Sequence, residues 1–244
     1  MRLYCIETGR IDMDRQVIMP ASPPGERIVI PIPTFVIQTN EASSLVDTGM
    51  SHTALDGTLD LRPRMVPLGG EAAYITNRLS AIGLAPADIT HVIATHFHFD
   101  HAGGLADFTH ATIVAQRSAV EAARTHSPRE REAVSIPGLR WQYVDGDTDL
   151  LPDVRLLRTD GHVVGHQAVL VTTEQSGRFL LAIDTIYSSA QLAADDWGAY
   201  ADRDAARASA SRVQQIATET GATLVYGHDA AQWATLRHAP AWYA

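Results

Sequence analysis

The sequence predicts an α+β fold arranged as a layered sandwich. Short apolar runs typical of strands come in two batches along the chain, and a segment with helical periodicity follows each batch. This order differs from the regular strand and helix alternation of a doubly wound sheet. With 244 residues and a mass of 26.4 kDa the chain is long enough to bury a sizeable core, and we expect residues 1–244 to form a single domain.

Residues 11–34 are expected to form one or two apolar surface loops. Five prolines interrupt this segment, and proline disfavours both helix interiors and central strands because it lacks a backbone N–H donor. Isoleucine and methionine residues lie between the prolines, so the loop should rest on the body of the fold. The five prolines are Pro20, Pro23, Pro24, Pro31 and Pro33.

The first batch of strands begins after these prolines. The apolar runs 34–39 and 43–50 predict a hairpin whose second strand ends at Asp47. Residues 71–82 carry apolar side chains at helical spacing, and Gly83 follows as a C-terminal cap. The later elements of this batch are a strand at 89–95, a strand at 111–116 and a helix at 117–125.

The second batch lies in the last ninety residues. Residues 154–159 predict a strand, and residues 167–184 predict a hairpin that turns near residues 175–177. The alanine-rich stretch 202–220 predicts a helix that ends at a glycine, and residues 222–229 form the last predicted strand.

Composition and charge disfavour several classes of function. The chain carries 19 basic residues against 28 acidic residues, a formal charge of −9, and nucleic acid is not the expected ligand because phosphate binding depends on grouped cations. Cys5 is the only cysteine, so any metal would be held by histidine and carboxylate side chains. No apolar stretch reaches the roughly 18 residues of a membrane span. With no signal-peptide pattern either, we expect a cytoplasmic protein without a membrane partner.

The strongest functional signal is the run THFHFDHAGG at residues 95–104. His96, His98, Asp100 and His101 are four metal-competent side chains within six residues, directly after a predicted strand. In an extended segment residues 96, 98 and 100 face one side, and a loop would bring His101 round to them. Two histidines two residues apart with a carboxylate suit a dication such as zinc. The alternative is a polar turn with surface histidines.

Further candidates lie at the ends of three later strands. His162 and His166 follow the first strand of the second batch, Asp184 ends the predicted hairpin with Tyr187 three residues on, and His228 follows the last strand. Each alone fits a hydrogen-bonded turn residue. Together with the first cluster, they place metal-competent groups at the ends of four separate strands, and a buried carboxylate among them requires a cation.

These motifs resemble those of the metallo-β-lactamase superfamily, whose HxHxDH signature matches residues 96–101. Within that superfamily the sequence resembles the N-acyl-homoserine lactonases over nearly the whole chain, from LYCIETGR through LVDTGM, HFHFDHAGG and GHVVGHQ to YGHD. The DTIY motif, with Tyr187 three residues after Asp184, distinguishes that family. The resemblance implies a four-layer αββα sandwich, with the site at strand ends between two sheets.

The resemblance also implies two zinc ions per chain, in a site that other divalent metals would fit. The implied ligands are His96, His98 and His162 for one ion, Asp100, His101 and His228 for the other, and Asp184 as the bridge. Asp47 and His166 would support the site from outside. The sequence departs from the family's usual TPGH motif because Asp160 stands in place of proline, and the loop should therefore be less rigid.

The activity that the resemblance implies is hydrolysis of the lactone ring of N-acyl-homoserine lactones, the reaction of quorum quenching, by a hydroxide shared between the metals. Tyr187 would donate a hydrogen bond to the carbonyl oxygen as charge develops there, and Asp100 would move the proton. The fatty tail of this small-molecule substrate needs an apolar groove. Ile18, Met19 and Met65, together with Tyr187, are the candidates that line it.

Other functions stay open on the sequence alone. The same fold and metals would also open another lactone, such as 4-pyridoxolactone. A nuclease should carry basic patches, and a thioester hydrolase should carry a C-terminal substrate region, whereas only 16 residues follow His228. A metal-binding sensor should have a closed coordination shell. The sequence predicts no oligomeric state.

Overall fold

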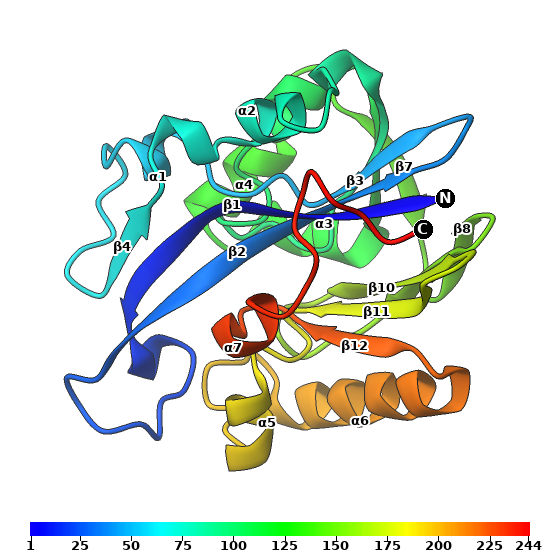
Figure 1. Cartoon of the computed structure of the whole chain (residues 1–244). Helices are drawn as coiled ribbons and strands as arrows, with labels where there is room; N and C mark the ends of the chain where they lie inside the picture. The colour runs from blue at the N-terminus through cyan, green and yellow to red at the C-terminus, as the bar shows by residue number, and fades with distance from the viewer.

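Two β-sheets pack face to face between two outer layers of helices (Figure 1). The computed structural model describes all 244 residues. Helices α2, α3 and α4 lie on the outer side of one sheet, and α5 and α6 lie on the outer side of the other (Figure 1). The predicted α+β class and the four-layer αββα arrangement are therefore confirmed.

The larger sheet is mixed, with seven strands in the order β4-β1-β2-β3-β5-β6-β7. Pairing is antiparallel from β4 to β3 and parallel from β3 to β7. The strands are β1 (Arg2–Asp14), β2 (Arg27–Gln38), β3 (Ser43–Val46), β4 (Met65–Leu68), β5 (Ile89–Ile93), β6 (Thr112–Gln116) and β7 (Arg140–Val144).

The smaller sheet has five strands in the order β12-β11-β10-β9-β8. Only the pairing of β11 with β12 is parallel. The strands are β8 (Thr148–Leu151), β9 (Val154–Arg158), β10 (Gln167–Thr173), β11 (Gly177–Ile183) and β12 (Thr223–Tyr226).

Seven helices connect and cover the sheets. The longest, α6, begins after Asp202, whose carboxylate accepts two backbone N–H groups, and it ends at the left-handed Gly221. The α-helices are α1 (His52–Leu55), α2 (Ile75–Ser80), α3 (Arg117–Ala123), α4 (Pro128–Val134), α5 (Ser189–Ala194), α6 (Arg203–Thr220) and α7 (Ala230–Trp233). The 3₁₀ turns are η1 (Arg15–Val17), η2 (Glu71–Ala73), η3 (Pro86–Asp88) and η4 (Leu105–Phe108). None of the helices has the length and apolar character of a membrane span.

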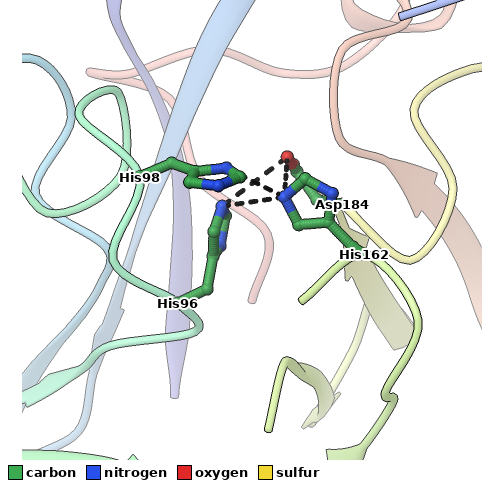
Figure 2. Close-up of side chains that lie close together, drawn as sticks. All are labelled: His96, His98, His162 and Asp184. Carbon is green, nitrogen blue, oxygen red and sulfur yellow. Dashed lines mark hydrogen bonds and ion pairs between the residues drawn. The ribbon is translucent and has the colours of Figure 1, made fainter. Parts of the chain in front are cut away.

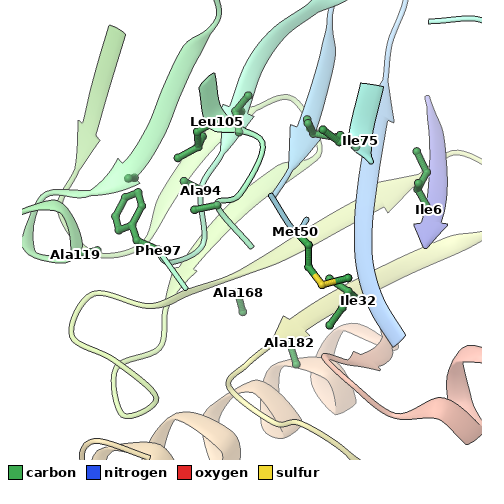
Figure 3. Packing of buried hydrophobic residues seen from close by; sticks show 14 of the residues in the cluster. Ile6, Ile32, Met50, Ile75, Ala94, Phe97, Leu105, Ala119, Ala168 and Ala182 are labelled. Carbon is green, nitrogen blue, oxygen red and sulfur yellow. The ribbon is translucent and has the colours of Figure 1, made fainter. Parts of the chain in front are cut away.

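Alternation along the strands divides the buried side chains between two hydrophobic clusters. In β11, Leu181 packs between the sheets, whereas its neighbour Leu180 belongs to the cluster that includes the buried face of α6. Phe35 and Val36 of β2 divide in the same way. Figure 3 shows part of the larger cluster, which includes Met50, in the segment after β3, and Phe97, in the segment after β5.

The prediction of a loop over residues 11–34 is wrong for the two ends of that segment, and only residues 15–26 lie outside the strands. β1 continues to Asp14, and β2 contains both Pro31 and Pro33. These prolines are tolerated because β2 pairs with β3 only from Phe35 onward, so one edge of the strand is free where they lie. The register between β1 and β2 also shifts at this point, which relaxes the demand for N–H donors.

The other predicted strands and helices are present in the structure, although their bounds differ by a few residues. The structure contains the hairpins β2–β3 and β10–β11 and the helix α6. The predicted helix 71–82 is divided into η2 and α2. The predictions omitted the short strands β4, β7 and β8 and the helices α1, α4, α5 and α7, all of which have seven residues or fewer and too little periodicity to detect.

Candidate active site

The predicted metal-competent side chains converge from four strand ends. His96 and His98 follow β5, His162 follows β9, Asp184 follows β11 and His228 follows β12. Figure 2 shows how the imidazoles of His96, His98 and His162 point toward one another and toward Asp184. Residues that lie far apart in the sequence therefore form one buried polar cluster.

The two carboxylate oxygens of Asp184 face different histidines. Oδ2 lies 3.2 Å from Nε2 of His162 and 3.7 Å from Nε2 of His96. Oδ1 lies 3.2 Å from Nε2 of His228 and 3.3 Å from Nε2 of His101. This geometry separates the cluster into two sets of imidazole nitrogens with Asp184 between them.

One further side chain completes each set. Nδ1 of His98 lies 3.0 Å from Nε2 of His162, in the set nearest Oδ2. Oδ2 of Asp100 lies 3.7 Å from Nε2 of His101 and 3.9 Å from Nε2 of His228, in the other set. Within each set the donor atoms lie within 4.8 Å of one another, close enough to share a cation.

The hydrogen bonds of the outer ring nitrogens indicate that the second set suits a cation. Nδ1 of His101 lies 2.9 Å from a carboxylate oxygen of Asp47, and Nδ1 of His228 lies 2.9 Å from the carbonyl of Pro31, so both nitrogens donate. In the neutral tautomers both Nε2 atoms then direct a lone pair at Asp184. Nε2 of His101 and Oδ1 of Asp184 are buried without a hydrogen-bond partner. A divalent cation fits these facing acceptors.

Burial and neighbouring charges shift the pKa values of the clustered side chains. Burial lowers the pKa of His96 and His162 well below the usual value. Burial would also lower the pKa of His101, but the carboxylates of Asp184 and Asp100 outweigh it and raise that pKa well above the usual value. Burial would raise the pKa of Asp184, yet the facing imidazoles hold it well below the usual range. The cluster therefore favours an ionised carboxylate among positive charges.

Two residues at the site hold strained backbone conformations. Ile183 and Asp47 adopt positive φ angles of 50° and 60°, which side chains other than glycine rarely do. The bend at Ile183 comes directly before Asp184. On the neighbouring strand, a Cβ at Gly227 would lie 2.4 Å from the carbonyl oxygen of Ile183, so only glycine allows this approach of the His228 loop.

Asp47 contacts the outer face of the site. Besides His101, its carboxylate accepts the backbone N–H of Thr95 at 2.8 Å and the Thr95 hydroxyl at 2.7 Å. The hydroxyl oxygen of Thr95 is also 3.1 Å from Nδ1 of His96. Asp47 and Thr95 therefore orient two histidine rings. Our sequence analysis did not single out Thr95, although its place next to His96 was a usable signal.

His166 has both ring nitrogens occupied. Its Nδ1 donates to the Thr159 hydroxyl at 2.8 Å, and its Nε2 accepts the backbone N–H of Asp184 at 3.2 Å. The ring therefore supports the backbone at Asp184 and offers no free lone pair to the cluster.

Tyr187 lies beside His162, with its hydroxyl oxygen 3.0 Å from Nδ1 of that ring. The side chain is buried, and burial raises its pKa well above the usual value, with further contributions from Tyr200 and Asp184. The hydroxyl is therefore protonated and can donate a hydrogen bond.

A cavity of about 270 Å³ opens onto the cluster. Asp100, Asp184 and Tyr187 line its polar part. Its apolar wall includes Ile11, Met13, Val17, Ile18, Ile30 and Met65. Ile18 and Met65 were predicted to line a groove and border this cavity, whereas Met19, which was predicted with them, does not border it.

Phe99 and Arg129 are among the lining residues that were not predicted. Both border this cavity and also a second cavity of about 230 Å³. Arg129 belongs to α4, a helix that the sequence analysis did not predict. Phe99 lies inside the histidine motif, where its apolar character was a usable signal.

Comparison with known proteins assigns the family. Residues 27–228 match the metallo-beta-lactamase superfamily. The chain is 34% identical to an N-acyl homoserine lactonase of Bacillus thuringiensis, over 98% of this chain and 97% of that protein. It is 30% identical to an N-acyl homoserine lactonase of Azorhizobium caulinodans, over 100% of this chain and 98% of that protein.

A solved structure has the same fold. It is an N-acyl homoserine lactone hydrolase with the product N-hexanoyl-L-homoserine bound at its catalytic metal centre, and it superposes with a TM-score of 0.92 at 32% identity. The superposition covers 99% of this chain and 98% of that one. The chain belongs to the metallo-beta-lactamase superfamily and, within it, to the N-acyl homoserine lactonase family.

The environment of His166 predicts a measurable pH dependence. Burial lowers its pKa to about 3, whereas the unfolded chain restores the ordinary histidine value of 6.5. Between these values the unfolded state binds a proton that the folded state excludes, so the free energy of unfolding should fall as pH falls through this window. His166→Gln removes this titration, and its stability should depend on pH more weakly, by about 1.4 kcal/mol per pH unit. Urea denaturation of both metal-free proteins measures this difference, and equal slopes would contradict a neutral buried ring.

Proposed function

We propose that this protein hydrolyses the lactone ring of N-acyl-homoserine lactones. One observation carries the proposal: the two oxygens of Asp184 face separate sets of imidazoles at the polar end of a cavity that has an apolar wall. A polar head and a fatty tail suit such a cavity. The activity named for the relatives at 30% to 34% identity, and the acyl-homoserine product named for the similar structure, support the same substrate class.

The site would hold two divalent cations, for which we propose zinc. The proposed ligands are His96, His98 and His162 for one cation and Asp100, His101 and His228 for the other, with Asp184 shared. Nitrogen and oxygen donors without a thiolate suit zinc, and they also accept iron, cobalt or manganese. Bound there, the cations would supply Lewis acidity toward the lactone carbonyl and lower the pKa of the attacking water.

Tyr187 would stabilise the charge that develops on the carbonyl oxygen. If Nε2 of His162 is the ligand atom, Nδ1 carries the ring hydrogen. Nδ1 then donates a hydrogen bond to the Tyr187 oxygen, 3.0 Å away. The hydroxyl hydrogen of Tyr187 is then free to point into the cavity that the residue lines. A donor placed in this way contributes most where water is excluded.

Asp100 would transfer the proton of the reaction. Water adds to the carbonyl carbon, the ring bond from that carbon to oxygen breaks, and the proton released by water must reach the leaving oxygen. Asp100 is buried beside His101 and His228 and also lines the cavity, so its carboxylate reaches both positions. The product is the open-chain hydroxy acid.

Tyr187→Phe should lower kcat by about 10- to 100-fold, because one hydrogen bond to the oxyanion is lost, which corresponds to about 1 to 3 kcal/mol in the barrier. The metal content should not change. Steady-state kinetics and elemental analysis of the same preparation measure both quantities. An unchanged kcat would place Tyr187 among the packing residues.

Asp184→Ala should lose the normal occupancy of both cations, because the shared carboxylate is removed and the facing imidazoles are left without their counter-charge. Elemental analysis after dialysis should show fewer than two equivalents. Asp204→Ala, which removes a carboxylate with 98% side-chain exposure, is the matched control and should bind as the wild type does. Tight binding of two equivalents by Asp184→Ala would contradict the bridging role.

Turnover of two substrates tests the proposed function directly. The metal-loaded protein should open N-hexanoyl-homoserine lactone, and ring opening is followed by the proton it releases. The bicyclic 4-pyridoxolactone has no acyl tail for the apolar wall, and its kcat/KM should be lower by at least tenfold. A preference for the bicyclic lactone would overturn the substrate assignment, and full activity after complete removal of metal would overturn the mechanism.

A further inference from the structure

We infer that Asp160 is a positioning residue for His162, and that its carboxylate fixes the loop that carries this histidine. The inference rests on the proposed function, because it assumes that His162 serves the metal site. It concerns residues 160–165, which connect the end of β9 to the residues before β10.

The Asp160 carboxylate joins the two ends of the loop. Its Oδ1 accepts the backbone N–H of Gly165 at 2.7 Å, which closes residues 160–165 into a ring that contains His162. Arg158 holds the carboxylate in this orientation, with Nε donating to Oδ2 at 2.6 Å and Nη2 donating to Oδ1 at 3.2 Å. The bidentate pair restricts the direction in which the acceptor points.

The first half of the loop is anchored separately, on the α6 side. The carbonyl of Gly161 accepts the N–H of Asp202 at 2.9 Å, and the carbonyl of His162 accepts the N–H of Ala201 at 3.3 Å. At Gly161 an added Cβ would lie 2.3 Å from the backbone nitrogen of Ala206, so the loop presses directly against the helix. This contact fixes one side of His162.

The second half also packs against a helix, because an added Cβ at Gly165 would lie 2.5 Å from the backbone nitrogen of Ala119 in α3, but its one short hydrogen bond is the bond from Gly165 to Asp160. Val164 is 54% exposed, and the bond from the His166 N–H to the Val163 carbonyl is long, at 3.4 Å. Gly165 adopts a φ of +72° and has the conformational freedom of glycine. The short bond from Gly165 to Asp160 is therefore the strongest hydrogen bond that holds this half of the loop.

The position of the His162 ring depends on both halves. Nε2 must stay 3.2 Å from Oδ2 of Asp184 while Nδ1 stays 3.0 Å from the Tyr187 oxygen. A rotation of the loop that displaces the ring by about 1 Å breaks both contacts, since hydrogen-bond energy falls steeply beyond the normal range. Asp160 thus acts through His162 and contacts neither cation nor substrate.

Metal binding by three variants tests this inference without using a lactone. Asp160→Ala removes the acceptor, Asp160→Asn keeps an acceptor for Gly165 and loses the charge, and Asp149→Ala removes a carboxylate with 78% side-chain exposure as a control. Competition with a chelator measures the zinc affinity of each equivalent, and the visible spectrum of the cobalt-substituted protein reports the ligand geometry.

In Asp160→Ala one equivalent of zinc should bind about 10- to 100-fold more weakly, while the other equivalent of zinc keeps its affinity. The visible spectrum of the cobalt-substituted variant should also change. Asp160→Asn should stay within about threefold of the wild type, and Asp149→Ala should match it. Wild-type affinity of both equivalents in Asp160→Ala overturns the inference, and so does equal weakening in the alanine and asparagine variants.

Asp160→Ser replaces the alanine variant if that protein fails to fold, because serine suits a turn and its shorter side chain cannot span the loop. The same outcomes then apply to it. A failure of the proposed function would appear as absent lactone turnover with these affinity differences intact, so the two conclusions can be rejected independently.

Discussion

The interaction between the Asp184 carboxylate and the imidazoles around it governs the rest of the structure. A carboxylate with 4% side-chain exposure is costly to bury unless positive charge faces it. The surrounding Nε2 atoms are lone-pair acceptors in their neutral tautomers, so the cluster is complete only with cations or protons between its members. Four strand ends from two sheets must meet at this point, and the strained conformations of Ile183 and Asp47 occur where the chain turns into it.

The outer ring nitrogens explain how the fold holds these imidazoles in place. His228 donates to the carbonyl of Pro31, a residue of β2, and His101 donates to Asp47, which follows β3. His162 contacts Tyr187, which lies beyond the end of β11. These three rings are therefore anchored on elements other than their own, so the metal geometry depends on how the strands pack together.

The sequence predicted the site better than the fold around it, for a physical reason. His96, His98 and His101 lie within one motif directly after the short β-branched strand β5, so local spacing alone indicated their convergence. The strand character of Pro31 depends on an unpaired sheet edge, which is a property of the tertiary pairing and leaves no local pattern. Arg129 was missed because α4 has only seven residues, too few to show a helical period.

The polar end and the apolar wall of the cavity come largely from different elements. The polar end comes from loops after β5, β9, β11 and β12, whose positions are tied to one another through Asp184. Most of the apolar wall comes from β1, β2, β4 and the residues around η1, which contribute no metal-competent side chain to the cluster. A substitution in the wall, such as at Ile18 or Met65, can therefore change the fit of an acyl chain without moving the histidines. Most of the wall and the metal-competent groups are encoded in separate elements, and only the metal-competent groups lie in a motif that a single sequence reveals.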